Sequence, residues 1–292
     1  MIRPFNINLL SGLVLTIILL GVISAAAVYV NARTYRDLAF DFQRQYMTRL
    51  MEAKTGDMLL DEVHQAQHAG LKLLEQDAFR AAYALRDADE LAAVLAGFFQ
   101  HEAASAAALK ITGLYVFGVD AGLLAAAGRP GTAAGGGAVI CPGLVRQARL
   151  QAGENNLQPL HELCALDGVP GMATLIAIGE ESAPGFLQVV SDPLPRLVQV
   201  GSRLDMPVQV RRMDDSIVYA TPGWVAESGS NEVMSDFVLS AADTQPLLRI
   251  TARRSADALV LQLDRTNNRL LLVVALIILT AVVFALLMVK YS

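Results

Sequence analysis

The chain has 292 residues, a formal net charge of −5 and no long basic cluster, which argues against nucleic-acid binding. Hydrophobic residues make up 54% of it and charged residues only 17%, and the mean hydropathy is +0.43. Because a soluble globular chain carries about 25% charged residues, this composition indicates a membrane protein.

The first apolar block, residues 9–30, contains no charged residue. About 20 apolar residues in a helix cross the hydrocarbon core, and in lipid the backbone needs the internal hydrogen bonds of a helix. We therefore predict a transmembrane helix over 9–30, preceded by a cytoplasmic N-terminus, 1–8. The alternative is a signal peptide cleaved near Ala25–Ala27, but its apolar region is typically about 7–15 residues long, which is shorter than this block.

Residues 31–110 have helical periodicity and are predicted to form a periplasmic stalk. An apolar face is expected from the residues that recur at helical spacing: Leu38, Phe42, Tyr46, Leu50, Leu59, Leu60, Val63, Leu71 and Leu74. Since this pattern follows directly on the first span, the simplest structure is one long helix that rises from the membrane. A shorter helix is expected to begin at the acidic residues Asp87 to Glu90 and to reach Phe99.

A first unit, residues 111–190, has strand patterns in place of helical ones. Four strands are expected, at Ile111–Val119, Leu123–Ala127, Gly171–Ile178 and Gly185–Val190. Between the second and third strands, a loop rich in glycine and alanine at 128–138 and a short helix at 143–151 are expected.

A second unit, residues 191–268, repeats the order of helix, strand, acidic turn and strand. Its elements are a helix over 192–200 and strands at Met206–Val210, Ser216–Ala220, Val233–Ser240 and Pro246–Ala252. A last helix starts near Ser255 and continues into a second predicted transmembrane helix, 269–289, whose apolar run from Leu270 has no charge. Residues 290–292 form a short cytoplasmic tail.

The whole pattern resembles the double Cache sensory domains of bacterial transmembrane receptors. Three stretches carry the resemblance: Leu114–Ala125, Leu187–Pro193 and Pro207–Tyr219. It implies an α+β fold in which a long N-terminal helix carries two PAS-like antiparallel α/β units, flanked by two transmembrane helices. Unit 111–190 would be distal to the membrane and unit 191–268 proximal to it.

The resemblance also implies that the central domain is periplasmic and that the chain lies in the bacterial inner membrane. Charges beside the spans are ambiguous on this point. Arg3 and Lys290 agree with cytoplasmic ends, whereas Arg33, Arg36 and Arg269 argue for the opposite orientation. A long middle segment can be translocated regardless of such charges. Two spans place both ends on the same side of the membrane, and because the resemblance implies an extracytoplasmic middle domain, we expect both ends in the cytoplasm.

Cys141 and Cys164 are the only cysteines. Outside the cytoplasm an even pair favours a disulfide, which here would contribute about 3 kcal/mol by the chain-entropy estimate. The alternative is two separate buried thiols. Their spacing is typical of neither a redox pair nor a zinc knuckle.

Neither a metal site nor a catalytic site is expected. His64 and His68 lie one helical turn apart, but a zinc site needs three or four ligands, so a polar helix face is the better interpretation. No nucleophile elbow, phosphate-binding loop or dinucleotide fingerprint occurs in the sequence. We therefore expect no enzyme activity and no cofactor.

Candidate ligand contacts follow from the resemblance, which implies a pocket lined by the central strands of the distal unit and the loop facing them. The residues at those places are Tyr115, Phe117, Arg129, Met172 and Thr174. Tyr115 and Phe117 share one face of a strand, which suits either a pocket wall or an ordinary core.

The leading hypothesis is a homodimeric transmembrane sensor that detects a small ligand or an envelope condition and signals to a cytoplasmic output. That output is missing from this chain, so either the sequence is part of a longer protein or the output is a separate polypeptide. The alternative is a membrane-anchored scaffold or accessory subunit that binds a protein partner. An envelope enzyme is the third and weakest hypothesis.

Overall fold

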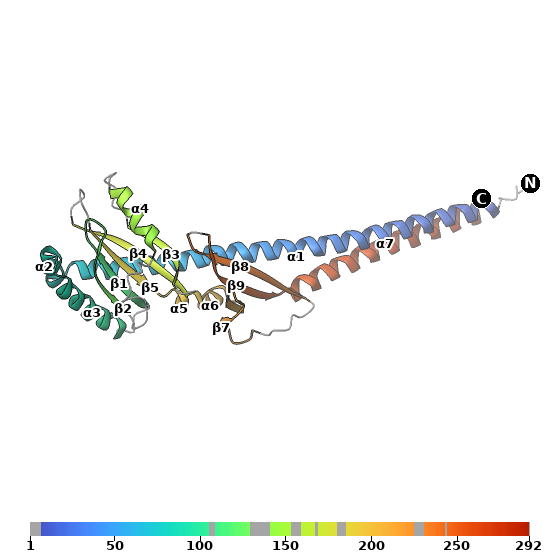
Figure 1. Cartoon of the computed structure of the whole chain (residues 1–292). Coiled ribbons are helices and arrows are strands. Elements are labelled where there is room, and N and C mark those ends of the chain that lie inside the picture. Colours follow the sequence, from blue (N-terminus) through green and yellow to red (C-terminus); the bar gives the residue numbers. More distant parts are fainter. Residues whose placement is uncertain are drawn as a thin grey trace, which may run out of the picture. The chain divides into compact units, whose positions relative to one another are not determined.

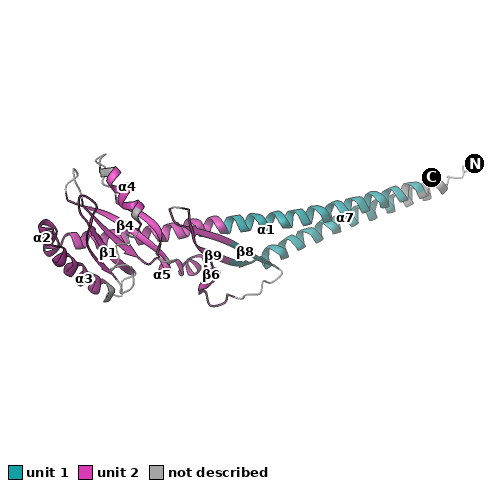
Figure 2. Cartoon of the chain, in the orientation of Figure 1, with its two compact units in different colours: residues 1–47, 225–235, 253–292 teal, residues 48–224, 236–252 magenta. Residues whose placement is uncertain are grey.

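The computed structural model describes residues 7–104, 109–128, 141–152, 159–166, 169–179, 185–224, 231–242 and 244–291 (Figure 1). The chain divides into two compact units (Figure 2). Unit 1 comprises residues 1–47, 225–235 and 253–292, and unit 2 comprises 48–224 and 236–252. The expected loop at 128–138 lies almost entirely outside the described residues.

Two helices are long and apolar enough to cross a membrane, α1 (Ile7–Leu74) and α7 (Asp257–Tyr291). Within unit 1 their apolar segments are in contact, since a β-carbon at Gly21 would lie 2.5 Å from Cδ1 of Ile278. A glycine at such a point lets two membrane helices approach closely. α1 is a single helix of 68 residues, which confirms the predicted long helix.

Unit 2 contains a five-stranded sheet in which every strand pairs antiparallel with its neighbours. The strand order is β2-β1-β5-β4-β3. Its strands are β1 (Ile111–Phe117), β2 (Leu123–Gly128), β3 (Leu160–Leu166), β4 (Val169–Ile178) and β5 (Gly185–Ser191). Four of them were predicted, while the edge strand β3 was not.

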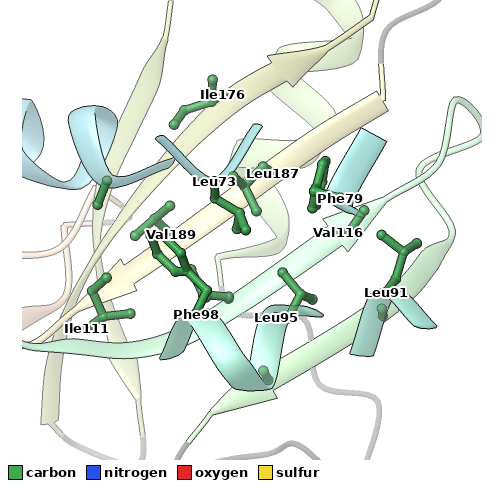
Figure 3. Packing of buried hydrophobic residues seen from close by; sticks show 14 of the residues in the cluster. Leu73, Phe79, Leu91, Leu95, Phe98, Ile111, Val116, Ile176, Leu187 and Val189 are labelled. Carbon is green, nitrogen blue, oxygen red and sulfur yellow. The ribbon is translucent and has the colours of Figure 1, made fainter. Parts of the chain in front are cut away.

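One face of this sheet is covered by the last turns of α1 together with α2 (Asp77–Leu85) and α3 (Ala88–Ala104). We call it the helix-covered face (Figure 3). Leu73, Phe79, Leu95 and Phe98 pack there against strand residues of the same sheet, Leu114, Val116, Ile176, Leu187 and Val189. Asp87 accepts hydrogen bonds from the amides of Asp89 and Glu90, as the predicted helix start requires.

The opposite face of the sheet lies under α4 (Pro142–Ala152), and we call it the α4 face. Successive side chains of a strand point to opposite faces of a sheet, so the residues next to those of the helix-covered face point toward α4. They form a second buried cluster with Leu144, Val145 and Ala148 of α4: Tyr115, Phe117, Ala173, Leu175, Phe186 and Val190.

A four-stranded sheet follows, with the order β7-β6-β9-β8. Its strands are β6 (Val208–Arg212), β7 (Ile217–Ala220), β8 (Glu232–Ser240) and β9 (Pro246–Ser255), after the short helices α5 (Leu194–Leu197) and α6 (Val200–Leu204). The predicted α+β fold with a long helix, two antiparallel sheets and two apolar helices is thus confirmed.

The apolar face predicted for α1 is largely wrong. The structure buries a different stripe, composed of Met47, Met51, Thr55, Met58, Glu62, Val63, Ala66, Ala69 and Leu73, and of the predicted set this stripe includes only Val63. Leu38, Phe42, Tyr46, Leu60 and Leu71 remain exposed. The stripe that contains small residues faces the sheet, because α1 lies very close to it. A β-carbon at Gly70 would collide with Ile176 of β4.

Candidate functional site

The structure divides the predicted ligand-contacting residues between the two faces of the five-stranded sheet. Tyr115 and Phe117 lie on the α4 face, where they are 3% and 0% exposed. Met172 and Thr174 alternate along β4 with Ala173 and Leu175, which belong to the cluster on the α4 face. Because successive side chains of a strand point to opposite faces, Met172 and Thr174 point to the helix-covered face. Arg129 lies outside the described residues. These contacts therefore remain predictions, and the two described pairs do not line one pocket together.

A pair of buried polar groups marks the α4 face. Tyr115 of β1 pairs in register with Gln188 of β5, and Gln188 is 0% exposed. The ring of Tyr115 lies over Gly113, since a β-carbon there would be 2.7 Å from its Cε2 atom. Burial raises the pKa of the Tyr115 hydroxyl, which keeps it neutral and able to donate a hydrogen bond.

Gln188 is a residue that the sequence interpretation missed. It interrupts the apolar run of β5, Gly185–Ser191, in which every residue is buried. A buried amide must find hydrogen-bond partners, so a lone polar residue inside an apolar strand is the signal that indicates such a site. Together the phenol and the amide offer hydrogen-bond donors and acceptors in an otherwise apolar layer.

Cys141 and Cys164 form the predicted disulfide, with Cα atoms 5.9 Å apart. The bond ties the residue before α4 to the edge strand β3, so one end of α4 is attached covalently to the sheet. Glu162 lies beside this link, close to Gly143 in the first turn of α4. The carboxylate and the two sulfur atoms lie within 4.8 Å of one another, but sulfur atoms bonded to each other are not free to bind a metal.

The two histidines considered as metal ligands, His64 and His68, are exposed on α1. Neither belongs to a group of three potential ligands among the described residues. A solvated polar helix face therefore accounts for both.

A cluster of charged groups lies between α1 and the segment that follows β5. Glu62 of α1 is 0% exposed, and its Oε2 atom lies 3.3 Å from Nε of Arg196 in α5. Arg196 also donates a hydrogen bond to Gln65 of α1 through Nη2. No local pattern in the sequence indicates this pair, because its members are 134 positions apart.

The neighbouring residues Asp192 and Lys110 complete this cluster. Lys110 forms an ion pair with Asp192, and the amide of Leu194 donates to Asp192 Oδ1 over 3.0 Å at the start of α5. Two positive and two negative side chains therefore meet where β5 passes into α5.

In unit 1 a chain of hydrogen bonds connects α1 with the start of α7. Arg36 donates to Asn231 Oδ1 over 3.2 Å, and Asn231 donates to Asp257 Oδ1 over 3.0 Å. Arg44 donates to the carbonyl of Met234 over 3.2 Å. Asn231, the residue before β8, thus bridges α1 and the first turn of α7 within unit 1.

No protein-family model matches the sequence, and no curated protein matches it. Among solved structures, the periplasmic domain of Vibrio cholerae LuxQ is similar, at 13% identity and a TM-score of 0.42, over 73% of this chain and 99% of that one. The sensor domain of the V. cholerae histidine kinase DctB is similar at 11% identity and a TM-score of 0.38, over 72% and 99% of the two chains.

The ligand-binding domain of the Campylobacter jejuni chemoreceptor Tlp3, in complex with L-norvaline, is similar at 11% identity and a TM-score of 0.37, over 75% and 93%. By their names these neighbours are a periplasmic domain, a ligand-binding domain and a sensor domain.

Proposed function

We propose that this chain is a transmembrane sensor of the bacterial inner membrane, with its two sheets in the periplasm and both ends in the cytoplasm. The observation that carries the proposal is the continuity of α1. One unbroken helix contains an apolar segment long enough to span the bilayer and contributes Ala66, Ala69 and Leu73 to the core of unit 2. A change in the packing of those residues is therefore applied to a helix that enters the membrane.

A small ligand is proposed to act on the α4 face. The Tyr115 hydroxyl and the Gln188 amide supply directional contacts in an apolar layer, which is the usual composition of a small-molecule site. Phe117 and Phe186 would pack against the apolar part of such a ligand. Met172 and Thr174 of β4, on the other face of the same sheet, would respond to the ligand through the sheet rather than touch it.

The signal is proposed to leave through both spans. α7 begins at Asp257, immediately after β9, and the Arg36–Asn231–Asp257 hydrogen bonds couple its first turn to α1. A ligand shifts such a device only if it binds two packings of the helices with unequal affinity. The change would be received by an output domain on the cytoplasmic side of the membrane.

A homodimer is proposed as the working form. In unit 1 the exposed side chains of Tyr35, Leu38, Phe42 and Tyr46 form an apolar stripe on α1, with exposed fractions between 53% and 70%. Spacings of three and four residues are those by which parallel helices pack. Three residues of the stripe, Tyr35, Leu38 and Phe42, also line an apolar groove of about 660 Å³ between α1 and α7, which a second copy would fill.

Thermal-shift measurements on the full chain in lipid nanodiscs test the ligand proposal. The panel would be amino acids, dicarboxylates and divalent metal salts, each added to oxidised protein. A compound at a hundredfold excess over its Kd stabilises the native state by about 2.7 kcal/mol. We expect a reproducible shift from one chemical class that is lost in Gln188→Leu and kept in Gln147→Leu, a matched change on an exposed side of α4.

The exposed stripe and groove of unit 1 also favour a second function, a scaffold that binds a different protein. The thermal-shift experiment distinguishes a ligand sensor from a scaffold. A scaffold gives no shift with any member of the panel while the chain remains folded, and then the stripe is its partner site.

A further inference from the structure

Three potential metal ligands lie together at one edge of the five-stranded sheet. Glu162 and Cys164 are two positions apart on β3, so both point to the α4 face, and Cys141 comes immediately before α4. One carboxylate oxygen and the two sulfur atoms lie within 4.8 Å of one another. Elsewhere in the described part of the chain, no three histidine, cysteine or acidic side chains come so close. The spacing in the sequence did not indicate this group, because only the fold brings Cys141 to β3.

The backbone holds these ligands in place independently of the disulfide. β3 pairs antiparallel with β4 over its whole length, which fixes the backbone of Glu162 and Cys164. Cys141 is positioned by α4, because its carbonyl accepts a hydrogen bond from the amide of Leu144 over 3.0 Å, and Leu144 is buried against the sheet. We therefore expect the three ligands to stay close together after the bond between the sulfur atoms is broken.

The arrangement matches the geometry that zinc requires. Zn²⁺ binds four ligands as a tetrahedron, with bonds of about 2.3 Å to sulfur and about 2.0–2.2 Å to a carboxylate oxygen. In such a tetrahedron the ligand atoms lie about 3.6–3.8 Å apart. The oxygen, at most 4.8 Å from either sulfur, needs to move by only about 1 Å to reach that distance. Rotation of the side chains is sufficient for this change.

The disulfide must be reduced first, because the thiolate is the form of cysteine that binds a metal. One thiolate of an external dithiol attacks a sulfur atom and forms a mixed disulfide, which the second thiolate of the dithiol then cleaves. The dithiol loses two electrons and becomes a disulfide, while Cys141 and Cys164 are left as thiols. Both thiols release a proton to water when they bind the metal. Cys164 is partly exposed on an edge strand, so the reductant can approach it.

Two thiolates and a carboxylate also select the class of metal. Sulfur ligands favour Zn²⁺ and other thiophilic cations over Mg²⁺ and Ca²⁺, which prefer oxygen ligands. Three protein ligands leave the fourth position of the tetrahedron to a water molecule.

We propose that Cys141, Cys164 and Glu162 form a redox-gated zinc site, which the disulfide closes and a dithiol reductant opens. In the reduced chain, Zn²⁺ would replace the covalent link between β3 and α4 with a coordinate one. The site belongs to unit 2 and does not rest on the proposed sensor function.

Titration of the full chain in nanodiscs with Co²⁺, a spectroscopic probe for zinc sites, tests the proposal. The protein is reduced with a dithiol, which is then removed without oxygen. We expect one Co²⁺ per reduced chain, with a thiolate-to-metal charge-transfer band that Zn²⁺ abolishes by displacement. The oxidised chain and reduced Cys141→Ser should bind none. A reduced wild type that binds no Co²⁺ overturns the site.

Two neighbouring residues of β3 give a matched test of the third ligand. Loss of an outer-shell partner of a metal ligand already weakens binding by about 10–100-fold, so Glu162→Gln should raise the Kd for Zn²⁺ by about tenfold or more. His161 lies opposite Thr174 on the other face of the sheet, and His161→Gln should bind as the wild type. Equal affinities of Glu162→Gln and the wild type contradict the proposed site and indicate adventitious binding by two thiols.

Thermal unfolding of the same samples shows whether the metal binds the folded chain. Zn²⁺ should raise the Tm of the reduced wild type toward that of the oxidised protein, because it restores the link between β3 and α4. It should leave the Tm of Cys141→Ser unchanged. If reduction unfolds the chain, binding by the unfolded thiols would not depend on Glu162, and this result also overturns the site.

Discussion

The two faces of the five-stranded sheet are built from the same strands but are covered in different ways. The helix-covered face packs against α2, α3 and α1, a helix that also contains an apolar segment long enough to span a membrane. The α4 face packs against one short helix that a disulfide attaches to the sheet edge. From this difference we propose that a single sheet separates two tasks: its α4 face would accept a ligand, and its helix-covered face would pass a change to α1.

The largest effect is expected from truncation on the helix-covered face. Leu73→Ala removes a fully buried side chain and should lower the free energy of unfolding by about 2–5 kcal/mol. Leu71→Ala, on the exposed side of the same helix, should change it by less than about 0.5 kcal/mol. Urea unfolding followed by the fluorescence of Trp224, the only tryptophan, measures both. Equal losses would mean that α1 does not pack on the sheet through this stripe.

Loss of the disulfide beside the α4 face should lower the free energy of unfolding by nearly as much. Replacing Cys141 and Cys164 by serine should lower stability by about 3 kcal/mol, because the unfolded chain regains the freedom of the closed loop. The same unfolding measurement, with the reduced wild type as the comparison, tests this. A double variant as stable as the oxidised protein would show that α4 does not depend on its covalent attachment.

Two glycines of α1 give a matched test of how closely the helix approaches the sheet. Gly70→Ala puts a methyl group against Ile176 and should destabilise by about 1–3 kcal/mol. Gly56→Ala has no neighbour within 4 Å and should stabilise by up to about 1 kcal/mol through helix propensity. Thermal unfolding distinguishes the two signs, and a stabilising Gly70→Ala would contradict the close contact.

The smallest effect is expected at Tyr115. Because burial raises its pKa, the neutral phenol is favoured in the fold, and stability is lost as the pH rises above its ordinary value of 10.0. The wild type should therefore lose stability relative to Tyr115→Phe between about pH 9 and pH 11. Parallel melting curves over this range would show that the hydroxyl is solvated and is no part of a buried site.

Strong local patterns in the sequence predicted most of the fold. The long helix and the strands on either side of the Asp120 turn have a local cause, and the structure confirms them as a helix and as strands. The edge strand β3 was missed because His161, Glu162 and Cys164 give it no apolar alternation. An edge strand tolerates such residues because one of its sides is unpaired.

The candidate site was harder to predict than the fold. Its composition depends on which face of each helix and strand is covered by other parts of the chain. α1 offers two apolar stripes, and only the sheet decides that Ala66 and Gly70 turn inward while Phe42 stays exposed. For the same reason Tyr115 and Thr174, which looked like parts of one pocket, point to opposite faces. The Glu62–Arg196 pair has no local signature at all.

The central claim is that α1 conducts a change from the sheet into the membrane. The most direct measurement is the distance between spin labels at Leu19→Cys and Leu276→Cys in nanodiscs, with and without the panel compound that gives the largest thermal shift. A helix displacement of about 1–2 Å, lost in Gln188→Leu, is the predicted result. A compound that stabilises the chain while the label distance stays constant would contradict the claim.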